Sequence, residues 1–230
     1  VCLRQGAERN VLNEYYGTAE TAIITVLLPE DYAEKPKRIA SVGKPRCGDL
    51  KIFDDKQKTW CPPNREGLIL SRTCTTVALR YPGSEEKLPE SIKIIDGEEW
   101  FDDGLLGTMD EDGFLYLTSR VKELIIVGGV NVYPHEIESV ILNHPKVFDV
   151  AVISSPDKDL GEVPAALVQL KKGEKMTKEE LTEHCKRNGL YGFKIPRIVE
   201  FREELSRHVD GKTMKRELQA ELWKRVQRRG

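Results

Sequence analysis

The first half of the chain has the pattern of short β-strands. Apolar runs alternate with clusters of Pro, Gly, Asp and Asn, which are typical of turns. The expected strands are residues 23–28, 50–53, 67–71 and 92–95. One hairpin is predicted at Asp110–Gly113, between the apolar residues 100–101 and 114–118, because Gly113 supplies the positive φ that a tight turn needs.

After residue 120 the apolar spacing alternates between the periods of strands and helices. The expected strands are residues 124–127, 150–153, 165–170 and 198–201, and the expected helices begin near Pro134 and Thr177, with a last helix around Leu218, Leu222 and Val226. The order strand, helix, strand, strand, helix, strand, helix is a compact α+β pattern. We therefore expect a small α+β domain in the second half of the chain.

The first of these helices has a clear buried face. Ile137, Val140 and Ile141 follow the i, i+3, i+4 spacing of an apolar stripe. Glu136 and Glu138 fall on the other face, which we expect to be polar.

The second helix has a clear start. Thr177 and Glu180 form the pattern of a capping box, in which each side chain bonds to the backbone of the other residue. Leu181 and Cys185 are expected to point inward from this helix.

The change of pattern near residue 120 predicts two domains. Ser119–Lys122 is a polar stretch between two apolar strands, and the boundary is placed there. The expected domains are a mainly β region at residues 1–119 and an α+β region at residues 120–230. The fold class is therefore α+β.

Composition excludes several classes of protein. The chain has 230 residues, with 39% hydrophobic and 32% charged residues, which is typical of a globular protein. No apolar run is long enough to span a bilayer, and the N-terminus does not resemble a signal peptide, so a cytoplasmic location is expected. The net charge of -2 argues against a nucleic-acid partner. The first residue is Val, so we expect the chain to be a piece of a larger protein.

Common catalytic and metal-binding signatures are absent from the sequence. It has no G-x-S-x-G, H-E-x-x-H, G-x-x-x-x-G-K-[ST] or G-x-G-x-x-G motif. Its five cysteines are irregularly spaced without C-x-x-C, which indicates free thiols. Its four histidines are scattered, so a transition-metal site is not expected.

Three polar segments that contain glycine are the candidates for chemistry. Residues 15–21 combine aromatic rings, a turn, hydroxyl groups and one acid, which suit an adenine ring, a phosphate and a divalent cation. Residues 120–123 precede Gly128–Gly129, where a ligand could pass close to the backbone. Residues 209–213 place Lys212 on a glycine turn before a helix, within reach of a phosphate. The first and third segments also have plain structural interpretations, a Thr/Glu turn and a solvated lysine at a helix end.

In this order and spacing, the segments resemble the adenylate-forming enzymes, which include acyl- and aryl-CoA synthetases, luciferases and peptide-synthetase adenylation domains. Residues 16–20 (YGTAE) are similar to the family motif Tyr-Gly-x-Thr-Glu, and residues 100–107 (WFDDGLLG) to Trp-Phe-x-Thr-Gly-Asp-Leu-Gly. Residues 119–138 are similar to the family's hinge and the loop after it. Residues 193–196 and Gly211–Lys212 complete the series. The double glycine and the Tyr-Pro before the helix are more similar to CoA ligases than to peptide-synthetase domains.

The resemblance implies roles for individual residues. Lys212 would be the catalytic lysine of adenylation, and Glu20 would serve catalysis by holding Mg²⁺. Lys122 would be the hinge, and Gly128 and Gly129 would line the passage for the thiol of CoA. The residues implied in binding the nucleotide are Tyr16, which would stack on adenine, Gly17 and Thr18 near the phosphates, and Arg120 at the ribose-phosphate.

The resemblance also implies an architecture and a reaction. The chain would be the C-terminal part of an AMP-forming acid–thiol ligase, with a partial β-barrel from the large domain followed by a mobile α+β lid. Such a ligase activates a carboxylic acid with ATP and Mg²⁺ to acyl-AMP and transfers the acyl group to CoA. The family's phosphate loop has no counterpart here, so the N-terminal half is expected in a longer parent chain or a companion chain. We expect the isolated chain to be inactive.

Two departures from the family motifs matter for nucleotide binding. Ala19 replaces the threonine that contacts phosphate, and Leu105 replaces the aspartate that accepts hydrogen bonds from ribose. Each charged hydrogen bond contributes about 1.5–3 kcal/mol, so the change to leucine is severe. Asp102 and Asp103 are expected on a different phase of the strand from Leu105, so neither is expected to replace the aspartate. These departures leave open an alternative, a degenerate non-catalytic relative that binds nucleotide or CoA or regulates a partner. A third alternative, a plain structural α+β protein, fits less of the pattern.

Overall fold

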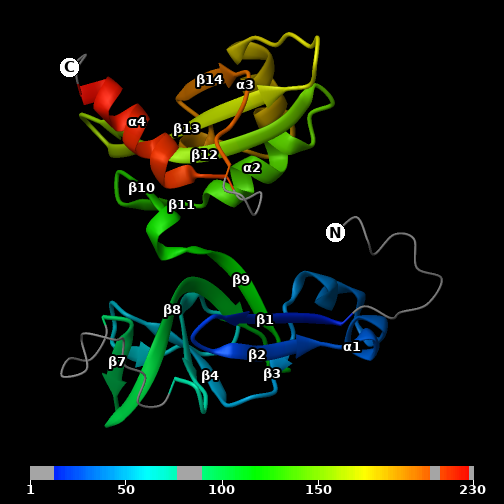
Figure 1. Ribbon diagram of the computed structural model, residues 1–230, viewed down its shortest axis with the longest axis vertical. Helices are drawn as coiled ribbons and strands as arrows, with labels where there is room; N and C mark the ends of the chain where they lie inside the picture. The colour runs from blue at the N-terminus through cyan, green and yellow to red at the C-terminus, as the bar shows by residue number, and fades with distance from the viewer. Residues whose placement is uncertain (1–12, 77–89, 208–212, 228–230) are drawn as a thin grey trace. The chain divides into compact units, whose positions relative to one another are not determined.

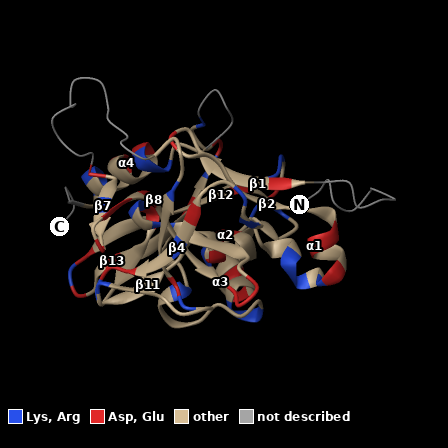
Figure 2. Ribbon diagram, turned by 90° about the horizontal axis from the view of Figure 1, so that it is seen from below, with Lys and Arg blue, Asp and Glu red and all other residues tan. Residues whose placement is uncertain are grey.

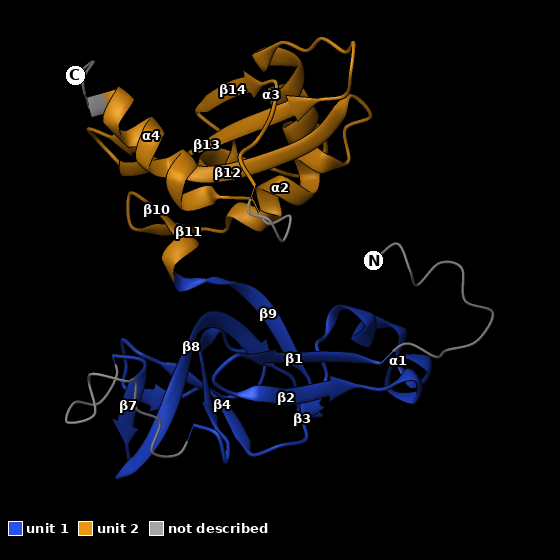
Figure 3. Ribbon diagram, in the orientation of Figure 1, with its two compact units in different colours: residues 1–121 blue, residues 122–230 orange. Residues whose placement is uncertain are grey.

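The computed structural model describes residues 13–76, 90–207 and 213–227, and the chain forms two compact units (Figure 1, Figure 3). Unit 1 is Val1–Val121 and unit 2 is Lys122–Gly230. The sequence places this boundary between residues 119 and 120. Helices and sheets occur together, which confirms the predicted α+β class.

Unit 1 contains two antiparallel sheets. The smaller sheet has the strand order β1-β2-β3, and the larger has the order β5-β4-β6-β8-β7 with β9 also paired to β8. The larger sheet curls into a half-barrel (Figure 1). The strands are β1 (Glu14–Thr18), β2 (Ala22–Leu27), β3 (Lys44–Pro45), β4 (Asp49–Asp54), β5 (Thr59–Trp60), β6 (Gly67–Arg72), β7 (Ile92–Ile95), β8 (Glu98–Met109) and β9 (Leu115–Arg120). The helical segments are α1 (Pro29–Glu34), η2 (Pro36–Ala40) and η3 (Val121–Glu123).

The core of unit 1 lies on both faces of its larger sheet. One cluster joins the two sheets and consists of Tyr16, Ile24, Leu50, Ile52, Ile69 and Leu115. A second cluster uses the alternate residues of the same strands, which are Phe53, Leu68, Leu70 and Trp100. Trp60 packs edge-on against Phe53 and Trp100, with ring centroids 5.2 and 4.9 Å away. Successive side chains of β4 and β6 point to opposite faces of the sheet, so each strand contributes to both apolar clusters.

The predicted hairpin at residues 110–113 is confirmed. It joins β8 to β9, and Gly113 has a φ of +81°. The side chain of Asp110 accepts hydrogen bonds from the amides of Asp112 and Phe114, at 3.0 and 2.8 Å. β8 is longer than the apolar pattern indicates because it pairs with β6, β7 and β9 along its length.

Unit 2 is a five-stranded sheet with helices on both faces. Its strand order is β11-β10-β13-β12, with β14 parallel to β13. The strands are β10 (Ile125–Val127), β11 (Val130–Val132), β12 (Val147–Asp157), β13 (Gly161–Leu170) and β14 (Ile198–Arg202). The helices are α2 (Pro134–Leu142), α3 (Lys178–Arg187), η4 (Gly192–Lys194) and α4 (Lys215–Gln227).

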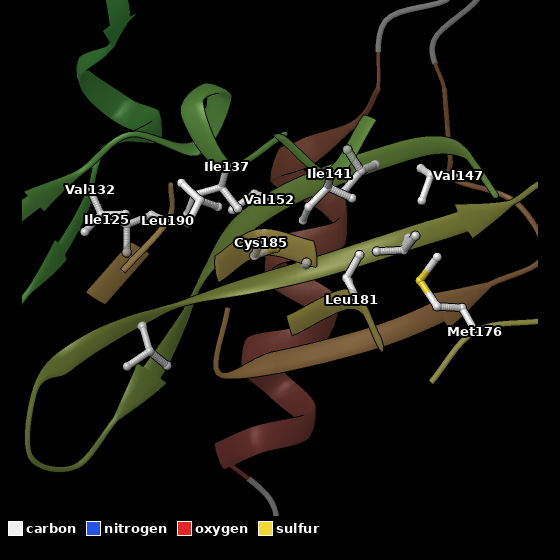
Figure 4. Packing of buried hydrophobic residues seen from close by; sticks show 14 of the residues in the cluster. Ile125, Val132, Ile137, Ile141, Val147, Val152, Met176, Leu181, Cys185 and Leu190 are labelled. Atoms are coloured by element: carbon white, nitrogen blue, oxygen red, sulfur yellow. The ribbon is translucent and has the colours of Figure 1, made fainter. Parts of the chain in front are cut away.

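The two faces of this sheet have separate cores. On one face, α2 and α3 contribute Ile137, Ile141, Leu181 and Cys185 to a cluster with β12 and β13 (Figure 4). On the other face, Leu218 and Leu222 of α4 pack on alternate residues of the same strands. Burial on both faces explains the nearly continuous apolar runs of β12 and β13. The inward positions predicted for Leu181 and Cys185 are confirmed.

One prediction for α2 is wrong. Glu138 was expected on a polar outer face, but its carboxylate accepts the amide of Val152 at 2.7 Å. β12 is an edge strand of the sheet, and its edge is covered partly by Glu138 and partly by Trp223, whose indole N–H donates to the carbonyl of Ser154 at 2.9 Å. Edge strands need such cover to avoid pairing with other chains. The spacing of apolar residues alone does not reveal this contact.

At the start of α3, Thr177 caps the helix as predicted. Its hydroxyl accepts the amide of Glu180 at 3.2 Å, while the carboxylate of Glu180 pairs with Lys146 at 2.7 Å.

Charged residues of both signs are interspersed along the chain (Figure 2), in keeping with its small net charge. No helix in the described ranges is both long enough and apolar enough to cross a membrane.

Candidate functional site

The segment around Gly17 forms a tight hairpin between β1 and β2. A Cβ atom on Gly17 would lie 1.5 Å from the carbonyl oxygen of Ala22, so only glycine fits. The hydroxyl of Thr21 accepts the amide of Thr18 at 2.8 Å and lies 2.9 Å from the hydroxyl of Thr18. These contacts hold the turn that carries Glu20.

The two tyrosines of this segment lie in opposite environments. Tyr16 is only 8% exposed and packs in the core between the two sheets, whereas Tyr15 is 66% exposed. The predicted stacking of Tyr16 on adenine stays a prediction. In this structure the exposed aromatic ring of the segment belongs to Tyr15.

A buried acid that the sequence analysis set aside lies beside Tyr16. The carboxylate oxygens of Asp103 in β8 and the hydroxyls of Tyr16 and Ser71 are all buried, and none has a hydrogen bond of normal geometry within the described residues. The two hydroxyl groups nevertheless adjoin the carboxyl group. Leu105 packs against the cluster that contains Tyr16, so Asp103 and Leu105 share one face of β8. The expectation that Asp103 lies on a different phase from Leu105 is therefore wrong.

The electrostatics of Asp103 follow from this burial. The pKa of Asp103 is raised to about 7: burial is the largest cause, the hydroxyls of Tyr16 and Ser71 act against it, and the carboxylates of Asp102 and Glu20 add to it. Burial and Asp103 also raise the pKa of Tyr16. Near neutral pH, Asp103 is therefore divided between its protonated and ionised forms.

Glu20 offers one carboxylate for Mg²⁺. It is half-buried on the turn between β1 and β2, close enough to Asp103 to influence its pKa. Among residues 13–76, 90–207 and 213–227, no three His, Cys, Asp or Glu side chains converge on a point that could hold a metal. Mg²⁺ in nucleotide sites is usually held by one or two carboxylates plus phosphate oxygens, and Glu20 fits that manner of binding.

Arg120 and Leu105 are cross-strand partners. They pair directly in the register of β8 and β9, and Arg120 is exposed at the end of β9. The position that carries aspartate in the family motif thus lies opposite the predicted nucleotide-binding arginine. In this chain Leu105 turns its side chain to the apolar cluster instead.

Lys122 and the double glycine lie at the start of unit 2. Lys122 is exposed in η3, at the first residue of the unit. Gly128 and Gly129 form the two-residue turn between β10 and β11, with φ values of +55° and +85°. Such a turn needs positive φ at both positions, which explains both glycines.

Lys212 lies outside the described residues, but the chain on either side of it is described. Arg207 and Thr213 form an isolated β-bridge, and the amide of Met214 donates to the carbonyl of Ser206 at 2.9 Å. Lys215, the first residue of α4, forms ion pairs that the sequence analysis missed, and no spacing signal indicates them.

Comparison with known proteins agrees with this layout. A family profile described as the AMP-binding enzyme C-terminal domain matches residues 136–212. A 2-succinylbenzoate–CoA ligase from Bacillus mycoides is 38% identical over 205 residues, which cover 88% of this chain and 40% of the ligase. The chain belongs to the adenylate-forming superfamily. It corresponds to the C-terminal portion of the acyl-CoA ligases in that superfamily.

Further relatives of the adenylate-forming superfamily show the same correspondence. A long-chain-fatty-acid–CoA ligase from Escherichia coli is 36% identical, covering 91% of this chain and 36% of the ligase. The structure of o-succinylbenzoate coenzyme A synthetase from Bacillus subtilis in complex with ATP and magnesium ion matches with a TM-score of 0.74 and 35% identity, over 90% of this chain and 41% of that one. This superfamily member thus spans about 40% of the length of the relatives that it matches.

Proposed function

We propose that this chain is the C-terminal part of an AMP-forming acid–thiol ligase that joins a carboxylic acid to CoA. The observation that carries the proposal is the match of about 90% of the chain, both units included, to a synthetase in complex with ATP and magnesium ion. In the first step the acid attacks the α-phosphate of ATP, which forms acyl-AMP and releases pyrophosphate. In the second step the thiol of CoA displaces AMP.

The residues of unit 1 would bind the nucleotide. The turn held by Thr18 and Thr21 presents Glu20, which would hold Mg²⁺, an ion that offsets phosphate charge when bound. The exposed guanidinium of Arg120 would contact the ribose-phosphate. Gly17 permits the close approach of the strands on which this turn depends.

The residues of unit 2 would serve the change between the two steps. Lys212 would place a positive charge near the α-phosphate, where negative charge develops during adenylation. Lys122 would be the hinge about which unit 2 turns between the steps. The Gly128–Gly129 turn, which has no side chains, would leave room for the pantetheine arm of CoA.

Pyrophosphate release tests the proposal. The native polypeptide that carries this sequence should release pyrophosphate with ATP, Mg²⁺ and a member of a panel of carboxylic acids. Residues 1–230 alone should release none, because the sequence has no phosphate loop. Robust turnover by residues 1–230 alone would show that adenylation does not need a phosphate loop and would contradict this part of the proposal.

A second candidate is a non-catalytic relative that binds nucleotide or CoA. The observation that favours it is Leu105, which faces the apolar cluster at the position of the ribose-binding aspartate. This candidate predicts binding of ATP or CoA by calorimetry without release of pyrophosphate by the native polypeptide. Release of pyrophosphate excludes it.

A further inference from the structure

Lys215 joins three separate segments of unit 2. Its ammonium group lies 3.1 Å from a carboxylate oxygen of Glu123 in η3 and 2.8 Å from one of Glu138 in α2. Glu123 follows directly after Lys122, the proposed hinge. The start of α4 is thus tied to the start of unit 2 and to the helix that follows the double glycine.

This ion-pair cluster is shielded from water. The side chains of Lys215 and Glu138 are 22% and 15% exposed, and that of Glu123 is 33% exposed, so the Lys215–Glu138 pair is the better shielded of the two. Burial lowers the pKa of Lys215, but Glu138 and Glu123 more than offset this effect and leave the pKa raised, so the lysine stays charged. The carboxylate of Glu138 in α2 also accepts a hydrogen bond from the amide of Val152, which ties Glu138 to β12. A shielded cluster of this kind is costly to break when one partner is removed.

The described residues that flank positions 208–212 are attached to the body of unit 2. On one side, Arg207 bridges to Thr213 and forms an ion pair with Asp149. On the other side, Lys215 follows Lys212 after two residues and is held by the cluster. The chain that enters and leaves this segment is therefore attached to the body of unit 2.

We propose that Lys215 is a positioning residue: its ion pairs lock the start of α4, three residues after Lys212, to η3 beside the hinge. The inference rests on the proposed function of Lys212 and Lys122. Lys215 acts through this attachment and touches no reacting atom.

Hydrogen exchange on residues 1–230 tests the attachment without any activity. In Lys215→Met, the amides of Met214 and Ile125 should both exchange about tenfold faster, since local opening follows the loss of the shielded pairs. Lys215→Arg, which keeps the charge, should restore most of the protection. Lys186→Met, at an exposed lysine of α3, is the matched control and should leave both amides unchanged. Unchanged exchange at Ile125 in Lys215→Met would overturn the proposal.

The two half-reactions of the native polypeptide test the positioning role. Lys215→Met should slow formation of acyl-AMP about tenfold or more, while the reaction of supplied acyl-adenylate with CoA stays within about twofold. Lys215→Arg should recover adenylation. Equal loss in both half-reactions, or no recovery with arginine, would overturn the positioning role. If the wild-type polypeptide forms no acyl-AMP, the proposed function fails, and hydrogen exchange alone decides whether Lys215 makes the attachment.

Discussion

Replacing Asp103 with asparagine should stabilise unit 1 at neutral pH. Asparagine keeps the shape of the side chain and can hydrogen-bond to the hydroxyls of Tyr16 and Ser71, but it has no charge to bury. The wild-type carboxyl group lies among buried hydroxyls and beside two further acids, Asp102 and Glu20. Ionising it in the folded state is therefore unfavourable.

The size of the effect follows from the pKa. Burial is the main cause that raises the pKa of Asp103 from 3.8 to about 7. Each unit of difference between the pKa in the folded and unfolded states corresponds to about 1.4 kcal/mol of folding stability. Because the folded state binds the proton more tightly, the stability that this group contributes is complete below pH 4 and is lost as the pH rises to about 7. The total loss is about 4 kcal/mol as an upper bound.

The assay is urea unfolding of wild type and Asp103→Asn between pH 4.5 and 8.5, followed by tryptophan fluorescence. Trp60 and Trp100 report on unit 1, and Trp223→Phe in both proteins removes the signal of unit 2. The advantage of the variant should grow with pH and level off above about pH 7. Asp102→Asn is the matched control.

The control differs from Asp103 in its partners. Asp102 accepts the amide of Gly104 at 2.9 Å and lies 3.4 Å from the ammonium group of Lys93. Asp102→Asn should lose up to about 1 kcal/mol from its own partners. Because the carboxylate of Asp102 is one of the smaller causes that raise the pKa of Asp103, its removal should recover only a small part of the gain that Asp103→Asn shows at neutral pH. The reasoning is refuted if Asp103→Asn is less stable than wild type by the same amount at every pH, because Asp103 would then be ionised and satisfied in the folded state.

Three further predictions concern unit 2. Lys212→Ala should slow formation of acyl-AMP by orders of magnitude and leave the attack of CoA on supplied acyl-adenylate nearly intact, as measured in the native polypeptide; equal loss in both steps would point to a structural role. Lys122→Pro should fix φ and impair thioester formation more than adenylation, whereas uniform damage would indicate misfolding. Lowering the pH from 7.5 to 5 should destabilise unit 2, because burial and the neighbouring ring of His184 lower the pKa of His144, whose Nδ1 accepts the amide of Lys146. The stability present above about pH 6.5 is lost as the pH falls through the lowered pKa, and Trp223 fluorescence should show this loss shrinking in His144→Leu.

Local pattern was enough to predict the features that depend on neighbours in the chain. The turn at Gly113, the cap at Thr177 and the buried face of α2 each follow from residues a few positions apart, and each is found in the structure. The α+β class follows from the same periodicities. The family motifs located the candidate site residues by the same kind of local match.

Contacts between distant segments were beyond local pattern. Tyr16, Ser71 and Asp103 lie on three strands that are far apart in sequence, so nothing in their spacing indicates one buried group. Lys215 meets Glu123 across 92 positions of sequence separation. Strand register brings the first three side chains together, and the packing of α4 against the rest of unit 2 brings Lys215 to Glu123.

Two residues of β8, Leu105 and Asp103, limit how unit 1 could hold a nucleotide. Leu105 lies opposite Arg120 and faces the apolar cluster, so it offers no hydrogen-bond acceptor. Asp103 lies on the same face, but with a pKa of about 7 it is protonated in much of the population at neutral pH. A protonated carboxyl group uses one oxygen as a donor, and its buried position keeps both oxygens from solvent. We therefore do not expect Asp103 to replace the aspartate of the family motif, and the proposed nucleotide site in unit 1 relies on Arg120, Glu20 and the backbone of the Gly17 turn.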